Sequence, residues 1–183
     1  MKVESIQAAR AAYDIEAQCI LEMKDYFDEV AFSRAVHLLA QAPRIGAAGC
    51  GHSGIICQHF AHLMCCIERP ARFISPAEAV HGATGFLQKG DVMVFASRGG
   101  KTKELLPIVD ICKAKGVSII TVTENLESPL AQAADVVPCM IFHDGALHDL
   151  PRAAGGAHRR NGLSGRTVRP HPSGRSGRRA AQS

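Results

Sequence analysis

A glycine-rich turn between a short apolar run and a helical segment constrains this chain more than any other feature. Residues 44–54 read Arg-Ile-Gly-Ala-Ala-Gly-Cys-Gly-His-Ser-Gly, which predicts a buried strand, a turn and a helix that begins near Ser53. Gly49, Gly51 and Gly54 allow positive φ angles and a close approach of the backbone to a ligand. The N–H groups and the dipole at a helix N-terminus favour an anion. We expect this anion to be a phosphate.

The same turn allows two other interpretations. Residues 49–54 fit G-x-G-x-x-G, the dinucleotide-binding pattern, which also requires an acidic residue at the tip of the next strand, about 20 residues on. That strand is predicted at 71–75, and neither Glu68 nor Glu78 falls at its tip. This argues against a dinucleotide. A tight turn that binds nothing is the other alternative.

A second turn of similar chemistry follows a buried run at 91–97. Its residues, Arg98-Gly-Gly-Lys-Thr102, lead into an amphipathic helix predicted over 103–115, and a third strand tip carries Thr121 and Thr123. Parallel strands of an open sheet present their carboxyl ends at one edge, so these turns are expected to converge on one crevice. Hydroxyl groups at three strand tips suit a polyhydroxylated, phosphorylated small molecule.

The charge of the chain is unevenly distributed. The formal net charge of the 183 residues is +4, but residues 151–183 hold 8 Arg and no acid, which leaves −4 for residues 1–150. The basic character therefore belongs to the C-terminal region, and no specific nucleic-acid partner is expected. The length suffices for one domain with a substantial core.

Cysteine usage and hydropathy indicate the compartment. The 7 cysteines show no C-x-x-C spacing and lie mostly in apolar runs, which favours reduced thiols in a cytoplasmic protein over disulfides or zinc. Neither a signal peptide nor a run of about 18 apolar residues is evident, so no membrane association is predicted.

The apolar pattern predicts a parallel α/β fold. Helices are expected over 5–23 and 28–42, and a helix over 55–66 that is apolar nearly all round is expected to be buried on more than one side. Strands alternating with helices then continue to 135–142, which predicts five parallel strands in a three-layer sandwich. The expected buried side of the second helix comprises Val30, Phe32, Val36, Leu38 and Leu39.

Three histidines are candidate functional residues. His59 and His62 have the helical spacing of two metal ligands, but no third ligand is in view, so no metal site is predicted and buried or interface histidines are the default. His81 follows a short helix for which Ser75 is the expected N-cap. It is a candidate acid or base, and an exposed residue at a helix C-terminus is the alternative.

Three motifs in this order resemble the sugar isomerase (SIS) domain, and in particular its arabinose 5-phosphate isomerase type. They are Gly49-Cys-Gly-His-Ser-Gly54, Pro76-Ala-Glu-Ala-Val-His81-Gly82 and Ser97-Arg-Gly-Gly-Lys-Thr102-Lys-Glu104-Leu105. The resemblance covers about residues 9–140. It implies a flavodoxin-like fold that forms homodimers or homotetramers and binds phosphorylated sugars at its strand tips. No cofactor is expected.

The resemblance also assigns roles to residues. The substrate-binding residues it implies are Gly51, His52, Ser53, Ser97, Gly100 and Thr102, with the three hydroxyls contacting the phosphate. Glu104 and His81 are the implied catalytic residues. Two positions depart from the pattern, because many of these isomerases have lysine where this chain has His52 and serine where it has Gly99.

The implied reaction is aldose-ketose interconversion of a sugar phosphate through an enediol, with Glu104 as the base. His81 would assist ring opening or shuttle protons. The alternative function is a non-catalytic module that senses a phosphosugar. Turnover of sugar phosphates distinguishes the two.

Three regions are predicted along the chain. Residues 1–43 form N-terminal helices of the SIS domain, 44–142 its α/β core, and 143–183 an atypical, disordered tail rich in Arg, Gly and Pro. From Pro151 on, only Leu163 and Val168 are aliphatic residues larger than Ala, and such a composition cannot bury a core face. Related domains continue with a long apolar helix here, so a shifted reading frame near codon 141 is one hypothesis for the tail.

Overall fold

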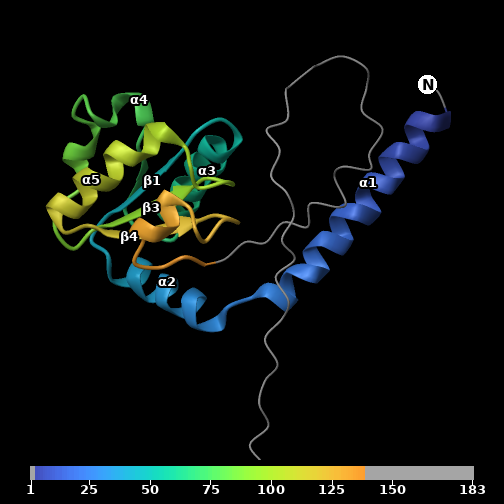
Figure 1. Cartoon of the computed structure of the whole chain (residues 1–183), viewed down its shortest axis with the longest axis horizontal. Coiled ribbons are helices and arrows are strands. Elements are labelled where there is room, and N and C mark those ends of the chain that lie inside the picture. Colours follow the sequence, from blue (N-terminus) through green and yellow to red (C-terminus); the bar gives the residue numbers. More distant parts are fainter. Residues whose placement is uncertain (1–2, 139–183) are drawn as a thin grey trace, which may run out of the picture. The chain divides into compact units, whose positions relative to one another are not determined.

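The computed structural model describes residues 3–138, and its sheet has four parallel strands in the order β2-β1-β3-β4 (Figure 1). The strands are β1 (Ile45–Gly49), β2 (Ala71–Phe73), β3 (Val92–Ala96) and β4 (Ser118–Val122). The α-helices are α1 (Val3–Glu22), α2 (Glu29–Gln41), α3 (His52–Cys66), α4 (Pro76–Ala79), α5 (Leu106–Lys115) and α6 (Pro129–Ala133). Short 3-10 helices are η1 (Met23–Tyr26), η2 (Ala83–Phe86) and η3 (Lys103–Leu105). The predicted parallel α/β class is confirmed.

Helices cover both faces of the sheet, which makes three layers. Successive residues of a strand point to opposite faces. Val94 of β3 therefore packs in one core with Ala35 of α2 and Ala61 of α3, while its neighbour Phe95 packs in the other core with Ile108 of α5. The buried residues of β1 and β3 are apolar or small, because a parallel sheet covered on both faces has no solvated side at its centre,.

The fifth strand predicted at 135–142 is described only as far as Pro138. Val136 forms a single parallel bridge with Ile120 of β4. The N–H of Ile119 donates a hydrogen bond of 2.7 Å to the carboxylate of Asp135, next to this bridge. The rest of that predicted strand and the predicted tail at 143–183 lie outside the described residues.

The prediction of a buried apolar side for α2 was wrong for three of its five residues. Val30, Phe32 and Val36 are exposed, while Leu38 and Leu39 are half-buried. The helix is well formed, because the Asp28 side chain at its N-cap accepts hydrogen bonds from the N–H groups of the first turn at 2.9 and 3.0 Å. Helical periodicity thus predicted the position of the helix but not how many of its apolar side chains are buried.

The predicted burial of α3 on more than one side was also wrong. Its fully buried core residues are small, Cys57 and Ala61, and Phe60 and Met64 are half-buried against the same core. Ile55 and Ile56 are each 63% exposed. Small side chains let the helix lie close to the sheet, and the two isoleucines lie on a side of the helix that the sheet does not cover. Among residues 3–138, no helix combines the length and the apolar character that crossing a bilayer requires.

The exposed apolar residues of α2 and α3 border a groove of about 430 Å³. Its floor includes Val94 of β3 and Ile120 of β4, and its walls include Phe32, Val36 and Ile56. Pro138, the last described residue, also lines it. The groove lies on the α2/α3 face of the sheet, and it reaches the carboxyl ends of β3 and β4, where Ala96 and Val122 line it.

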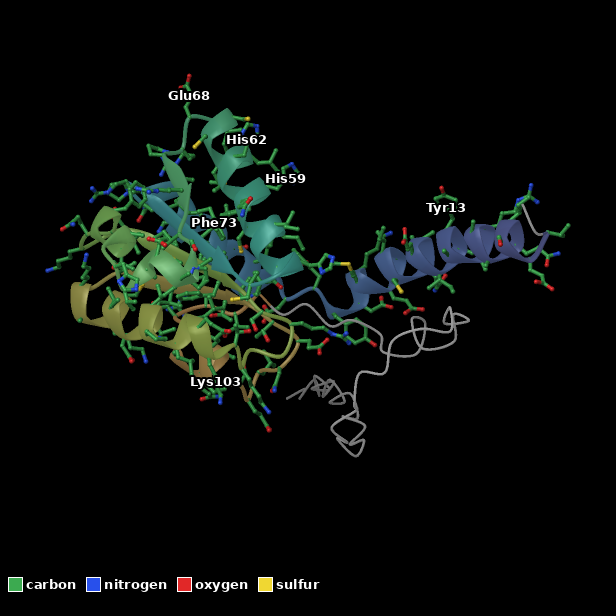
Figure 2. The ribbon with its side chains drawn as sticks, turned by 90° about the horizontal axis from the view of Figure 1, so that it is seen from above. Tyr13, His59, His62, Glu68, Phe73 and Lys103 are labelled. Carbon is green, nitrogen blue, oxygen red and sulfur yellow. The ribbon has the colours of Figure 1, made fainter. Side chains whose placement is uncertain are left out.

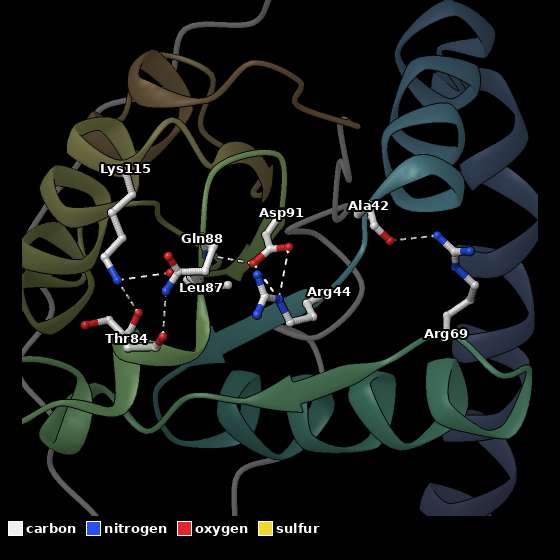
Figure 3. A network of polar contacts seen from close by, with 9 residues as sticks. Ala42, Arg44, Arg69, Thr84, Leu87, Gln88, Asp91 and Lys115 are labelled. Atoms are coloured by element: carbon white, nitrogen blue, oxygen red, sulfur yellow. Dashed lines mark hydrogen bonds and ion pairs between the residues drawn. The ribbon is translucent and has the colours of Figure 1, made fainter.

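A polar network joins the chain segments directly before β1 and β3 (Figure 3). Arg44 makes an ion pair with the buried Asp91, with Nε 3.0 Å from Oδ2, and the same carboxylate accepts a 2.7 Å hydrogen bond from the N–H of Gln88. Lys115, at the end of α5, donates from Nζ to two carbonyls near η2 at 2.8 and 3.0 Å. Because this network lies at the amino ends of the strands, it fixes the sheet without occupying the opposite edge.

Candidate functional site

The turn after β1 is packed so tightly that two of its glycines admit no side chain. A Cβ on Gly54 would lie 2.8 Å from the carbonyl oxygen of Gly49, and a Cβ on Gly49 would lie 2.7 Å from the Ser53 backbone. Gly51 has φ +58° and forms the N-cap of α3, where it provides no side-chain oxygen to the first turn. The first N–H groups of α3 are therefore left for a ligand or for water.

The turn after β3 has a different construction. Ser97 is buried, and its Oγ lies 2.8 Å from Oγ1 of the half-buried Thr102. The N–H of Gly100 donates to the Ser97 carbonyl at 3.0 Å, which closes the turn. Gly100 has φ +62°, and a Cβ there would collide with the side chain of Ser128. Glycine is thus required at this position on two grounds.

The third strand tip does not join these two turns. Thr121 donates its hydroxyl to the Leu130 carbonyl at 3.1 Å, and Thr123 donates its hydroxyl to the Arg98 carbonyl at 2.9 Å. Thr123 also accepts a hydrogen bond from the N–H of Asn125. The prediction of three hydroxyl-bearing tips facing one ligand was therefore wrong at β4, because its hydroxyls hold neighbouring loops.

The first two turns leave the sheet side by side. β1 and β3 are paired in parallel along their whole length, with Gly49 opposite Ala96, so the turns that follow them begin at the same edge. Of the hydroxyl residues predicted to bind substrate, Ser53 is half-buried in the first turn and Ser97 and Thr102 contact each other in the second.

A pocket of about 620 Å³ connects the first turn to Glu104 and to the end of β2. Its lining residues are Gly49, Cys50, Gly51, Gly54, Ile55, Gln58, Phe73, Ser75, Pro76, Ala77, Val80, Glu104 and Pro107. Of the described residues that line it, none comes from 97–102. The strand order β2-β1-β3 places Ser75 and Glu104 on opposite sides of the first turn.

The electrostatics of the pocket are dominated by one carboxylate. Glu104 is exposed on η3, and its charge acts on the half-buried Cys50. The pKa of the Cys50 thiol is raised, first by burial and then by this carboxylate. Cys50 is therefore a neutral thiol beside a carboxylate that is open to solvent.

His52 and His81 lie outside the lining of this pocket. His52 is exposed at the start of α3. His81 is exposed after α4, and its backbone N–H donates to the Glu78 carbonyl at 3.0 Å. Both side chains are accessible from solvent, and both lie next to segments that do line the pocket.

Sequence reasoning missed several residues of the pocket, most clearly Gln58 and Phe73. Gln58 had a signal, because it is one of three polar residues in a mostly apolar helix and follows Gly54 by four positions, and positions i and i+4 share a face,. Phe73 had none, since a single aromatic residue in a three-residue strand is ordinary core composition.

His59 and His62, the candidate metal ligands, lack a third ligand among residues 3–138. Figure 2 shows His59 and His62 together on one side of α3, and the Cys66 sulfur lies 3.7 Å from Nε2 of His62. Within the described part of the chain, no group of three histidine, cysteine or acidic residues is arranged to hold a metal ion. The described cysteines are free thiols.

Comparison with known proteins places this geometry in a family. The SIS domain pattern matches residues 38–147, more than half of the chain. The chain belongs to the SIS domain family. Arabinose 5-phosphate isomerase KdsD of Pseudomonas aeruginosa is 38% identical to it over 99 residues, which are 54% of this chain and 30% of that protein. The chain spans between 30% and 42% of the length of curated relatives such as this one.

Two solved SIS domain structures are similar over most of the fold. A putative sugar-phosphate isomerase from Listeria monocytogenes has a TM-score of 0.70 at 38% identity and covers 74% of this chain, which covers 72% of it. A protein of Escherichia coli CFT073, solved in a ligand complex, has a TM-score of 0.70 at 26% identity, with coverage of 80% and 78%. The predicted SIS architecture is thereby confirmed.

Proposed function

We propose that this SIS domain catalyses aldose-ketose interconversion of a phosphorylated sugar, with an activity of the arabinose 5-phosphate isomerase type. One observation carries the proposal: Glu104 and the anion-attracting turn Gly49–Gly54 line the same pocket. A carboxylate next to a phosphate-binding turn is what an enediol mechanism needs. The relatives named as arabinose 5-phosphate isomerases support the same reaction.

The phosphate is held by the turns after β1 and β3 in this proposal. The uncapped N–H groups of α3 and the Ser53 hydroxyl approach it from one side, with Gly51 and His52 in the same turn. Ser97, Gly100 and Thr102 approach it from the other. Binding energy gained at the phosphate then holds the reacting carbons in place at no cost to the chemical step.

Glu104 acts as the base. It removes a proton from the carbon next to the carbonyl and returns it to the neighbouring carbon, while the enediol oxygens are stabilised by hydrogen-bond donors. Its exposure on η3 lets it reach a ligand without first breaking a contact within the protein. His81 assists ring opening or shuttles a proton between the oxygens.

Isomerase assays with aldopentose and aldohexose phosphates test the proposal. Glu104→Gln keeps the shape of the side chain but removes the base, so we expect kcat to fall by about 10²- to 10⁴-fold with the dissociation constant of the sugar phosphate little changed. Glu127→Gln, at an exposed loop position away from the pocket, is the matched control and should leave kcat unchanged.

A sensing module is the second candidate. His52 and Gly99, which replace the lysine and serine of many isomerases, favour it, because each replacement removes a group from a substrate-binding turn. Tight binding of a sugar phosphate by the unmutated chain without turnover would establish the sensor and reject the isomerase. Turnover that depends on Glu104 would do the reverse.

Self-association is part of the proposal. The exposed apolar side chains of α2 and α3, among them Val36 and Ile56, favour burial against another protein surface. We expect a homodimer or homotetramer, as light scattering on a size-exclusion column would show. A monomer at all concentrations tested would contradict this expectation.

A further inference from the structure

We infer that Ser75 and Gln58 determine the specificity of the pocket by hydrogen bonding to the sugar hydroxyls of the ligand. This inference rests on the proposed function, in which the pocket takes a phosphorylated sugar. It gives a role in ligand recognition to the wall of the pocket formed by the end of β2 and by α3. The proposed mechanism uses the glycine turns, Glu104 and His81 but not this wall.

Ser75 has a hydroxyl that the fold does not use. It stands at the N-cap of α4, where a serine side chain ordinarily accepts a hydrogen bond from an N–H of the first turn. Here it makes no such bond, and the Ser75 backbone carbonyl accepts the N–H of Glu78 at 3.0 Å instead. The half-buried hydroxyl lines the pocket and keeps both its donor and its acceptor capacity,.

Gln58 supplies the second polar group. It lies four residues after Gly54 on α3, on the face that the helix presents to the pocket,. Its neighbours on the lining, Ile55 of the same helix and Phe73 of β2, are apolar. Gln58 is exposed, and its amide makes no hydrogen bond to another residue among residues 3–138, so its two N–H donors and its carbonyl acceptor are available to a ligand.

Ser75 and Gln58 are placed to contact the sugar hydroxyls that lie beyond the phosphate and the reacting carbons. Ser75 and Glu104 flank the first turn from opposite sides, and α4 packs against η3. A sugar phosphate anchored at the turn with its reacting carbons beside Glu104 would extend its other hydroxyls toward β2. The ring of Phe73 offers an apolar surface to the C–H groups of such a sugar.

The charge of this wall also favours hydroxyls. Glu104 is the only carboxylate among the described residues that line the pocket, and no lysine, arginine or histidine of residues 3–138 lines it. Neutral donors and acceptors bind hydroxyl groups without competing for the phosphate. A site built to hydrogen-bond a hydroxyl discriminates strongly against an analogue that lacks it.

Calorimetric titration of the full chain tests the inference with three probes: an aldopentose 5-phosphate that it binds, the analogue lacking one ring hydroxyl, and inorganic phosphate. For Ser75→Ala and for Gln58→Leu we expect affinity for the pentose phosphate to fall about tenfold, as expected for one hydrogen bond. Affinity for inorganic phosphate should change less than about twofold in both variants. Ser75→Thr, which keeps a hydroxyl, should restore most of the affinity.

Ser33→Ala and Gln41→Leu are matched controls, since both residues are exposed on α2 and line neither cavity. Pentose phosphate affinity and discrimination unchanged in the Ser75 and Gln58 variants would overturn the inference and leave the proposed function standing. A parallel loss for pentose phosphate and inorganic phosphate would also overturn it, because the residues would then serve the phosphate or the fold. If the unmutated chain binds no sugar phosphate at all, the proposed function fails and this inference fails with it.

Discussion

The hydroxyl oxygen of Ser97 lies 2.8 Å from that of Thr102, across the turn that follows β3. One of the two hydroxyls donates to the other, so the pair presents a donor and free lone pairs at fixed positions. The pair begins one residue after Ala96, which lies opposite Gly49 at the start of the other glycine turn. The two turns therefore begin next to each other at the same edge of the sheet.

The hydroxyl pair predicts a specific loss of binding. Ser97→Ala and Thr102→Val each remove one hydroxyl, and we expect affinity for a sugar phosphate to fall about tenfold or more because hydrogen bonds to a charged group are the stronger ones. Isothermal titration measures this. Ser118→Ala, at the opposite end of the sheet on β4, should bind as the unmutated chain does, and an equal loss in that control would point to the fold rather than the site.

Alanine substitutions at the two glycines of the second turn should have different effects on the free energy of unfolding. Gly100→Ala places a Cβ at φ +62° and against Ser128, whose Oγ accepts the N–H of Ala131 in α6, so the free energy of unfolding should fall by about 2–4 kcal/mol. Gly99→Ala places its Cβ in open space and should change that free energy by less than about 0.5 kcal/mol. Urea unfolding compares the two. Equal effects would mean that Ser128 does not hold the turn.

Two ion pairs that differ in burial should lose different amounts of stability when their carboxylate is removed. Asp91→Ala removes a buried carboxylate that holds Arg44 and the Gln88 N–H, and should cost about 3 kcal/mol. Glu124→Ala breaks the exposed pair with Arg98 and should cost no more than about 1 kcal/mol. Denaturant titrations of both variants check the order. A larger loss for Glu124→Ala would contradict the role of burial in this comparison.

Two buried thiols predict a loss of stability in alkali. Burial raises the pKa of Cys57 to about 11 and that of Cys112 to about 12, from 9.0 in the unfolded chain. Folded protein therefore holds these protons where unfolded protein releases them, so their stabilising contribution is full below pH 9 and is lost as pH rises toward 11 and 12,. Urea midpoints at several pH values measure the slope, which Cys112→Ala should reduce. A midpoint that rises with pH in this alkaline range would carry the wrong sign.

Local pattern was sufficient to predict β1, β3 and the two turns that follow them. The run at 45–49, the positive φ of Gly51 and the buried strand at 92–96 all follow from residue types within a few positions of one another. Glu104 lines the pocket beside the first turn, as expected when strand order in a parallel sheet brings neighbouring carboxyl ends together,.

The burial of helix side chains by distant parts of the sequence could not be predicted in the same way. The apolar pattern predicted one buried side for α2 and burial on more than one side for α3. Whether Phe32 or Ile56 is covered depends, however, on surfaces far away in the sequence. Thr123 looked identical to Ser97 as a strand-tip hydroxyl, and only the course of the following loop shows that it binds the Arg98 carbonyl. Gln58 and Ser75 come from different elements, so their shared wall appears only in three dimensions.

The proposed function requires that the turns at 49–54 and 97–102 bind one phosphate with the sugar beside Glu104. A crystal structure of the chain with a bound aldopentose phosphate is the decisive measurement. We expect phosphate oxygens within about 3.2 Å of the first N–H groups of α3 and of the Ser97 and Thr102 hydroxyls, with a reacting carbon next to the Glu104 carboxylate. A sugar phosphate bound elsewhere, with both turns empty, would refute the proposal.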